Sequence, residues 1–435
     1  MRALAPIDSA WRGALAGVVR VAVLGAAILR AAMIVVVLLV AATCSTAAPD
    51  ERADGTWVGT ITTEGNVTTV VNESGSVWGG TARLVEEASI GVESGAEEYL
   101  FGEIHSIFAD ETRIYVVDRQ VPAVRMYDHE GAFLGNLGAE GQGPGEYTRP
   151  SLVTVDERGL VYVADSQLRR INVYSPDGEP LDNWSVPNYM CCYVPMYAIG
   201  EGRLQIPVHA APPSRLFGFQ SYGAEGPTGE ERWIPDFDFE PVRRSVGGRG
   251  VGVRFTPALV FAPVPAGGVV AGINDSYRFE VQHHDGRRLV VEHRRPQVRL
   301  FPEEWEWWRR YSVAATRVFR QIPDYDWDGA EMPHHKPVYD HFIPSTTGEI
   351  WVARENVSER IPGCAEDPIA AGYEVLETDP CWRADWLFDA FGEDGRYLGS
   401  VEPLQGTPQH AFQRRVFVRA PGHFFGAHAG GEMSA

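Results

Sequence analysis

The sequence predicts an all-β fold in which short antiparallel strands form the blades of one β-propeller. The main observation is an internal repeat, because Asp118 and Asp165, and likewise Tyr127 and Tyr174, are 47 residues apart. A period in the forties is typical of a propeller blade of four strands. Apolar residues alternate with a period of two in both copies, as strands packed between neighbouring blades require. The 46 glycines and 30 prolines suit many tight turns.

The two clearest copies of the repeat lie at 107–134 and 153–181. Gly131 and Gly178 each follow an acidic residue between two apolar runs, which predicts a tight hairpin at the same point of each blade. The later blades match only in the spacing of their strands and turns, and not residue by residue. We expect them at about 195–240, 258–292 and 342–402.

A last blade is predicted from both ends of the chain. The strand-like run 416–428 begins it, and we expect the N-terminal runs 57–62 and 67–72 to supply its missing strands. Closure of the ring by both termini would remove the open sheet edges that a propeller must avoid. The predicted organisation is an export signal at 1–43, a linker at 44–54, and a six-bladed propeller at 55–430 with a helical insertion at about 294–341.

Several segments follow the pattern of a known repeat. They are 141–147, Pro150, 155–156, Gly159, 161–166, 170–171 and 173–174. These residues resemble the NHL repeat of six-bladed β-propellers. The segment 90–146 also resembles a group of exported bacterial six-bladed propeller proteins and lipoproteins of unassigned activity. The resemblance covers roughly residues 90–187, and it implies an NHL-like propeller that is exported.

The first 43 residues are typical of an export signal. Arg20 and Arg30 precede the apolar stretch 31–43, which is too short to span a bilayer comfortably. Cys44 follows directly, in a context that resembles a bacterial lipobox, where the cysteine carries lipid and becomes the mature N-terminus. Ordinary cleavage near Ala47 is the alternative. We therefore expect either a periplasmic protein or a lipoprotein anchored to the membrane through Cys44.

The remaining cysteines suit an oxidising compartment. Cys364 and Cys381 flank a segment of 16 residues that contains Pro and Gly, which predicts a disulfide-closed loop. Cys191 and Cys192 are adjacent and could form a vicinal disulfide or remain a thiol pair. No Cys/His spacing indicates a structural zinc site.

Charge excludes one class of partner. The formal net charge is -20, and an acidic surface repels phosphate backbones, so no nucleic acid partner is expected. Lys336 is the only lysine, which we interpret as a feature of genome composition.

The insertion at 294–341 contains a predicted helix at 302–320, begun by Pro302 and two glutamates. Propeller geometry places this insertion, the segment 189–197 and the Cys364–Cys381 loop on one face. Helical spacing predicts that one side of the helix packs on the propeller, through Phe301, Trp305, Trp308, Ser312, Ala315 and Phe319. The alternative is a lid over a pocket for peptides or sugar rings, with candidate ligand-binding residues Trp307, Tyr311, Tyr325, Trp327, His334 and His335.

Two histidines are candidate metal ligands. His105 and His341 lie near the first strands of predicted blades, where some propeller lyases and lactonases bind Ca²⁺ or Zn²⁺ on the central axis. Core histidines with ordinary hydrogen bonds are the alternative, since no repeated acidic set accompanies them. The recurrence of Asp118 and Asp165 predicts a structural role, in which a carboxylate at a strand end accepts backbone N–H bonds.

These patterns favour a binding or scaffold propeller without enzymatic activity. Its expected partner is a peptide, glycan or protein of the cell envelope, bound on the face that carries the Trp-rich insertion. The alternative is a metal-dependent hydrolase or lyase, similar to a lactonase, with a central Ca or Zn site. No nucleophile signature accompanies the repeat.

Overall fold

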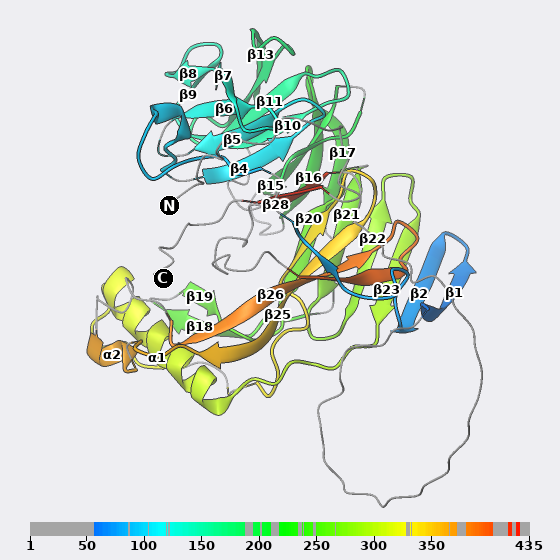
Figure 1. Ribbon diagram of the computed structural model, residues 1–435, viewed down its shortest axis with the longest axis vertical. Helices are drawn as coiled ribbons and strands as arrows, with labels where there is room; N and C mark the ends of the chain where they lie inside the picture. The colour runs from blue at the N-terminus through cyan, green and yellow to red at the C-terminus, as the bar shows by residue number, and fades with distance from the viewer. Residues whose placement is uncertain are drawn as a thin grey trace, which may run out of the picture.

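The computed structural model confirms an all-β propeller with one long helix (Figure 1). The structure describes residues 56–402 together with 416–419 and 423–426. Within the first range it leaves out 86–87, 103, 119, 121, 188–194, 201, 210–216, 234–236, 238, 247–248, 266, 328–330, 332, 365 and 372–379.

Within the described part of the chain, five sets of four consecutive antiparallel strands form blades one to five. Blade one contains β4 (Ile104–Ala109), β5 (Ile114–Asp118), β6 (Ala123–Tyr127) and β7 (Phe133–Leu137). Blade two contains β10 (Pro150–Val155), β11 (Val161–Asp165), β12 (Arg170–Tyr174) and β13 (Pro180–Ser185). Blade three contains β14 (Tyr197–Ala198), β15 (Leu204–His209), β16 (Phe217–Gly223) and β17 (Gly226–Trp233). Blade four contains β20 (Leu259–Pro263), β21 (Gly268–Ile273), β22 (Arg278–His283) and β23 (Arg288–His293). Blade five contains β24 (His341–Pro344), β25 (Ile350–Arg360), β26 (Trp382–Phe391) and β27 (Tyr397–Glu402).

Shorter elements lie in the connections. They are η1 (Glu97–Tyr99), β8 (Ala139–Glu140), β9 (Glu146–Tyr147), β18 (Arg243–Val246), β19 (Arg249–Gly252), α1 (Pro302–Phe319) and α2 (Pro368–Ala371). The helix α1 begins at Pro302, as predicted, and ends one residue before the predicted end.

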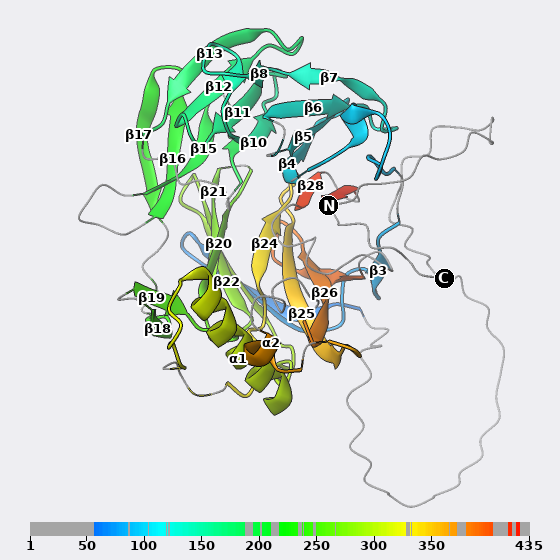
Figure 2. The same ribbon diagram turned by 90° about the vertical axis from the view of Figure 1, so that its left-hand side faces the viewer.

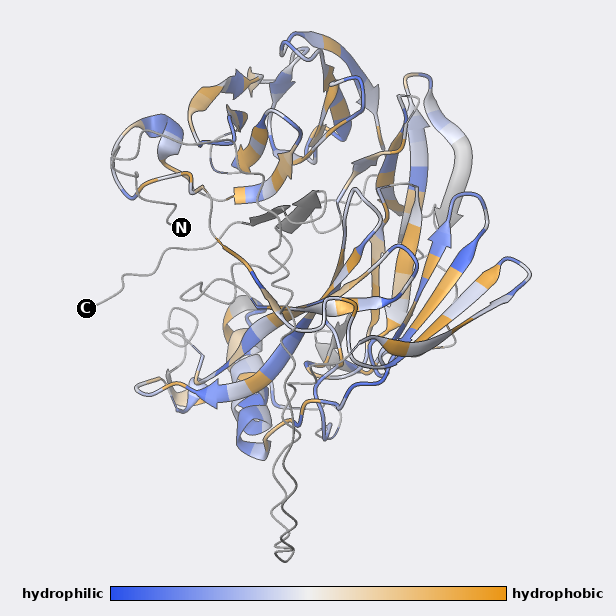
Figure 3. Ribbon diagram, turned by 45° about the vertical axis from the view of Figure 1, so that its right-hand side comes forward, coloured by the Kyte–Doolittle hydropathy of each residue, from blue (hydrophilic) through white to orange (hydrophobic). Residues whose placement is uncertain are grey.

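The core lies between neighbouring blades. Val116 of blade one and Val163 of blade two belong to one buried cluster, and Phe279 of blade four and Phe391 of blade five belong to another. Figure 3 shows hydrophobic residues concentrated in the strands of the blades. The period-two alternation produces this arrangement, because each strand sends side chains to both faces and each face meets another blade.

The recurring aspartates have the structural role that was predicted. Asp118 accepts hydrogen bonds from the backbone N–H groups of Gly102 and Gln120, at 2.8 and 3.0 Å. Asp165 accepts equivalent bonds from the backbone N–H groups of Thr148 at 2.7 Å and Gln167 at 2.9 Å. Each carboxylate therefore ties the end of the second strand to the chain that enters the blade.

The N-terminal strands do not complete the last blade, and that expectation is wrong. β2 (Val67–Ser74) pairs in parallel with β23, and β1 (Val58–Glu64) pairs with β2, so blade four becomes a sheet of six strands. β3 (Ala82–Arg83) pairs in parallel with β27 and extends blade five. In Figure 1, β1 and β2 lie beside β23 at the outer edge of the propeller.

Asn72 on β2 provides a physical reason for this placement. Its buried amide oxygen accepts hydrogen bonds from Trp57 Nε1 and from the backbone N–H of Tyr397, both at 2.7 Å. Its amide nitrogen donates to the backbone oxygens of Glu292 and Gly395, both at 3.1 Å. One side chain thus joins the N-terminal hairpin to blade four and to blade five.

A further pair of strands lies between blades five and one. β28 (Val416–Arg419) pairs antiparallel with β29 (His423–Gly426), and β28 contacts both β24 and β4. These are the first strands of the fifth and first blades. The C-terminal pair therefore contacts blade one and blade five.

Candidate functional site

Three segments that interrupt the repeat come together on one face of the propeller. The first is 243–258, with β18 and β19, and the second is 294–340, with α1. The third is 356–385, which forms the tip of the β25–β26 hairpin and includes α2. Only the described residues of each range are meant. Figure 2 shows these elements gathered at one end of the molecule. We call this group the insert module. The predicted meeting of the helical insertion and the Cys364–Cys381 loop on one face is confirmed, because α1 contacts α2.

One side of α1 packs against the segment that follows β19. Trp305 is buried in a cluster with Val253, Phe255 and Leu300. Its ring also contacts that of Trp327 edge to face, with centroids 5.6 Å apart. Two connections that are about 50 residues apart in the sequence therefore share one hydrophobic core.

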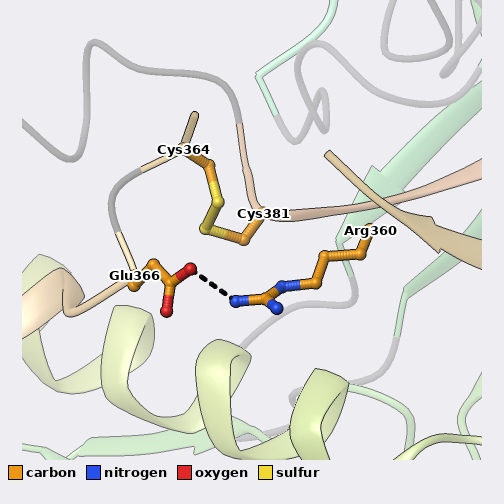
Figure 4. Close-up of a disulfide and its surroundings, with 4 residues drawn as sticks. All are labelled: Arg360, Cys364, Glu366 and Cys381. Carbon is orange, nitrogen blue, oxygen red and sulfur yellow. Dashed lines mark hydrogen bonds and ion pairs between the residues drawn. A yellow bond between two sulfur atoms is a disulfide. The ribbon is translucent and has the colours of Figure 1, made fainter. Parts of the chain in front are cut away.

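The other side of α1 packs against the disulfide. Cys364 and Cys381 are bonded, as predicted, and Cys381 is buried beside Trp307 and Ala314. Figure 4 shows the disulfide near α1, with the ion pair of Arg360 and Glu366 alongside at 2.6 Å. The disulfide thus holds the tip of the β25–β26 hairpin against the helix.

Because α1 is covered on two sides, its buried surface differs from the predicted one. Trp305 is buried as expected, but Ser312 and Ala315 are only half-buried. Trp307 was assigned to an open pocket and is only 5% exposed. Val313 is fully buried as well. Helical spacing predicts one packed stripe, whereas contacts on two sides require a wider one.

The six candidate ligand-binding residues lie in separate places. Trp307 stacks on Tyr311, with ring centroids 5.4 Å apart, beside the disulfide. Tyr325 is buried against Val313, and Trp327 packs near it and on Trp305. His334 and His335 are exposed. Of the six, only Tyr311, Trp327, His334 and His335 present surface to a ligand.

The two candidate metal ligands do not occupy equivalent positions. His105 lies at a β-bulge, between Ile104 and Ser106, and the strand pairing makes Ser106 the counterpart of His341. His341 Nδ1 lies 3.0 Å from Asp340 Oδ2. Among the described residues, no three His, Cys, Asp or Glu side chains form a group suited to a metal ion.

A buried ion cluster joins parts of the insert module to β25. Lys336 Nζ lies 3.2 Å from Glu304 Oε1 and 2.9 Å from Glu355 Oε2, and it donates to Ser358 Oγ at 2.6 Å. The side chains of Lys336 and Glu304 are each 1% exposed. We call these four residues the Lys336 cluster. It joins the first turn of α1, the end of the insertion and β25.

Arg254 and Phe255, which follow β19 in the sequence, lie next to the Lys336 cluster. Phe255 has a backbone φ of 63°, which is a strained conformation for a bulky residue, and its ring centre lies 5.6 Å from Lys336 Nζ. The Arg254 guanidinium lies 3.9 Å from the ring centre of Trp308 and 3.5 Å from Glu355 Oε1. Sequence reasoning missed this cluster. The available signal was that Lys336 is the only lysine in an arginine-rich chain.

A second buried polar cluster lies between blades four and five, around Asp389. This carboxylate accepts hydrogen bonds from Tyr277 Oη at 2.7 Å, Arg354 Nε at 2.9 Å and Arg295 Nη1 at 3.2 Å. Ser400 Oγ donates to it as well, at 2.9 Å. Burial alone would raise the pKa of Asp389, but the two guanidinium groups outweigh burial and hold that pKa below its usual range.

His293 borders the Asp389 cluster and is stacked on Tyr397, with ring centroids 4.4 Å apart. Burial lowers the pKa of His293 to about 4, against the partly compensating charge of Asp389. The imidazole is therefore neutral at physiological pH.

The Asp389 cluster is a charge-reversed form of a pair in blade one. Strand pairing places Arg354 at the position of Asp118, and Asp389 at the position of Arg125. In blade one, Asp118 and Arg125 form the same buried contact at 3.8 Å with the charges exchanged. The two clusters are thus variants of one structural position, which argues against a dedicated catalytic role for Asp389.

Cys44, Cys191 and Cys192 lie outside the described residues. Among the residues that the structure does describe, no helix is long and apolar enough to cross a membrane.

Comparison with known proteins supports the fold. Residues 94–200 match a family model described as a 6-bladed beta-propeller, which covers about a quarter of the chain. No curated protein matches the sequence. The chain is therefore an all-β propeller whose clearest blades are similar to that family.

Several solved structures are similar in fold. A member of the DUF4221 family from Bacteroides vulgatus is 13% identical with a TM-score of 0.47, over 76% of this chain and 88% of that one. A Bacteroides fragilis protein provisionally described as exported is 10% identical with a TM-score of 0.38, over 70% and 72%. Virginiamycin B lyase from Staphylococcus aureus is 7% identical with a TM-score of 0.37, over 75% and 92%. Identities this low carry no information about a shared activity.

Proposed function

We propose that this protein is an exported, non-enzymatic β-propeller that binds a peptide, glycan or protein partner of the cell envelope on its insert module. The observation that carries the proposal is the assembly of three unrelated connections into one packed structure on a single face. Loops that a rigid scaffold holds in place are where binding residues are found most often. The disulfide and the Lys336 cluster fix this module, so that it offers a preformed surface.

The surface available for binding is narrower than the sequence suggests. Trp307 and Tyr325 are used in packing, whereas His334 and His335 are exposed and Tyr311 and Trp327 are half-buried. Tyr and Trp side chains suit contacts with peptides and sugars, because each combines a large apolar ring with a polar group.

Peptide and glycan arrays probed with the purified protein test this proposal. We expect binding to at least one class, and its loss in the double variant His334→Ala/His335→Ala with an unchanged melting temperature. The matched control is His283→Ala/His284→Ala, which removes the other adjacent pair of histidines, at the end of β22 in blade four. Equal loss in both variants, or metal-dependent hydrolysis of lactones by the wild-type protein, would overturn the proposal.

We further propose that the ring has six blades of NHL type, with β28 and β29 belonging to the sixth. The contacts of β28 with β24 and β4 support this count. We also propose that export uses the N-terminal signal and that Cys44 carries lipid. Metabolic labelling with a radioactive fatty acid tests the second point, because Cys44→Ser should abolish incorporation.

A further inference from the structure

We propose that Lys336 and Glu304 become joined by an intramolecular amide bond, which locks the start of α1 to the end of the insertion. The proposal concerns the Lys336 cluster and does not depend on the binding function. An amide needs an amine beside a carboxyl group, a group that removes a proton, and the exclusion of water. The Lys336 cluster provides each of these.

The amine and the carboxyl group are held together away from solvent. Lys336 Nζ lies 3.2 Å from Glu304 Oε1, and both side chains are 1% exposed. The ring of Phe255 covers the amine on the apolar side, with its centre 5.6 Å from Nζ. Well-oriented reacting groups within one molecule can reach effective concentrations of about 10⁵–10⁸ M, so holding the two groups together favours condensation.

The two oxygens of Glu304 have different surroundings. Oε1 accepts a hydrogen bond from Ser358 Oγ at 2.6 Å, as the oxygen that keeps its bond to carbon would require. Oε2 is buried and has no hydrogen-bond partner among the described residues. A buried, unpartnered carboxylate oxygen is costly, and its departure as water removes that cost.

Glu355 is placed to move the proton. Its Oε2 lies 2.9 Å from Lys336 Nζ, closer than Oε1 of Glu304, which lies at 3.2 Å. We infer that Glu355 takes one proton from the ammonium group, which frees the nitrogen lone pair, and returns it to the leaving oxygen.

The reaction balances without any other reagent. The bond between Nζ of Lys336 and Cδ of Glu304 forms, and the bond between Cδ and Oε2 breaks. The ammonium group loses two protons, and both leave with Oε2 as one water molecule. The positive and negative charges of the pair disappear together, which suits a site closed to water.

The consequence is a second covalent closure of the insert module. The amide would close the chain between residues 304 and 336 around α1, while the disulfide closes the neighbouring hairpin between residues 364 and 381. α1 packs against that disulfide through Trp307. The module would then keep its shape even where the surrounding propeller is loosened.

Mass spectrometry of the full-length protein tests the proposal directly. We expect the mature chain to be one water molecule lighter than its sequence and disulfide require, with a branched peptide that links residues 304 and 336. Because Lys336 is the only lysine, a lysine-reactive reagent applied after denaturation gives an independent result. It should label no lysine in the wild-type chain.

Variants separate the cross-link from an ordinary ion pair. Lys336→Arg and Glu304→Ala should restore the full mass, and Glu355→Gln should slow cross-linking by about 100-fold or more. Glu303→Ala is the matched control, since Glu303 is the exposed neighbour on the same turn, and it should still cross-link. A folded wild-type chain of full mass with a labelled Lys336 would overturn the proposal, as would a water loss that persists in Lys336→Arg.

Discussion

Replacing Asp389 by asparagine should weaken the junction between blades four and five. The substitution keeps the size of the side chain but removes the charge that Arg354 and Arg295 face, at 2.9 and 3.2 Å. Breaking a buried ion pair by removing one partner costs about 3–5 kcal/mol, because the other charge stays buried and unpaired. An unfolding entropy of about 2.1 cal/mol/K per residue, over roughly 350 folded residues, converts about 4 kcal/mol into a fall of about 5 °C in melting temperature.

Differential scanning calorimetry at pH 7 measures this fall. The matched control is Asp394→Asn, which removes the same charge from an exposed pair with Arg396 at 2.6 Å. Surface pairs contribute little, so the control should lower the melting temperature by roughly 1 °C or less. The reasoning is refuted if Asp389→Asn costs no more than the control, since the Asp389 cluster would then not hold the two blades together.

Three further perturbations have expected outcomes. His293 binds a proton less readily in the folded chain, with its pKa lowered from 6.5 to about 4, so stability should fall by about 3 kcal/mol as pH drops through this window. Urea unfolding across pH 4–7 measures that slope, and His293→Gln should flatten it; an unchanged slope would assign the acid sensitivity to other groups. Asn72→Ala should cost about 2–4 kcal/mol because it breaks four hydrogen bonds, whereas Asn66→Ala, which loses one exposed bond on the same hairpin, should cost much less. Replacing Cys364 and Cys381 together by serine should cost about 3 kcal/mol and open the hairpin tip to limited proteolysis; equal protease resistance would show that packing on α1 suffices.

Much of the fold could be predicted because its signals are local and repeated. Asp118 and Asp165 recur at a fixed offset, and their bonds to the entering chain are short-range. The disulfide could be predicted because Cys364 and Cys381 bracket one short loop. The helix α1 could be predicted from its starting proline and its periodicity.

The candidate site was predicted less well, because its contacts join distant segments. Trp307 was a candidate for ligand contact if α1 formed a lid, yet it is buried beside the disulfide. The pairing of β2 with β23 depends on hydrogen bonds from Asn72 to blades four and five, and no local pattern indicates that choice.

The sequence by itself determined the β-propeller class, the two clearest blades, the helix and the disulfide, since each follows from spacing within one stretch of chain. The tertiary structure alone decided where the N-terminal strands pair, which aromatic rings stay accessible, and which charges are buried together. Lys336 shows the difference. In the sequence it is an isolated lysine, and in the fold it meets Glu304 and Glu355, because three insertions fold over the same face and exclude water from their meeting point.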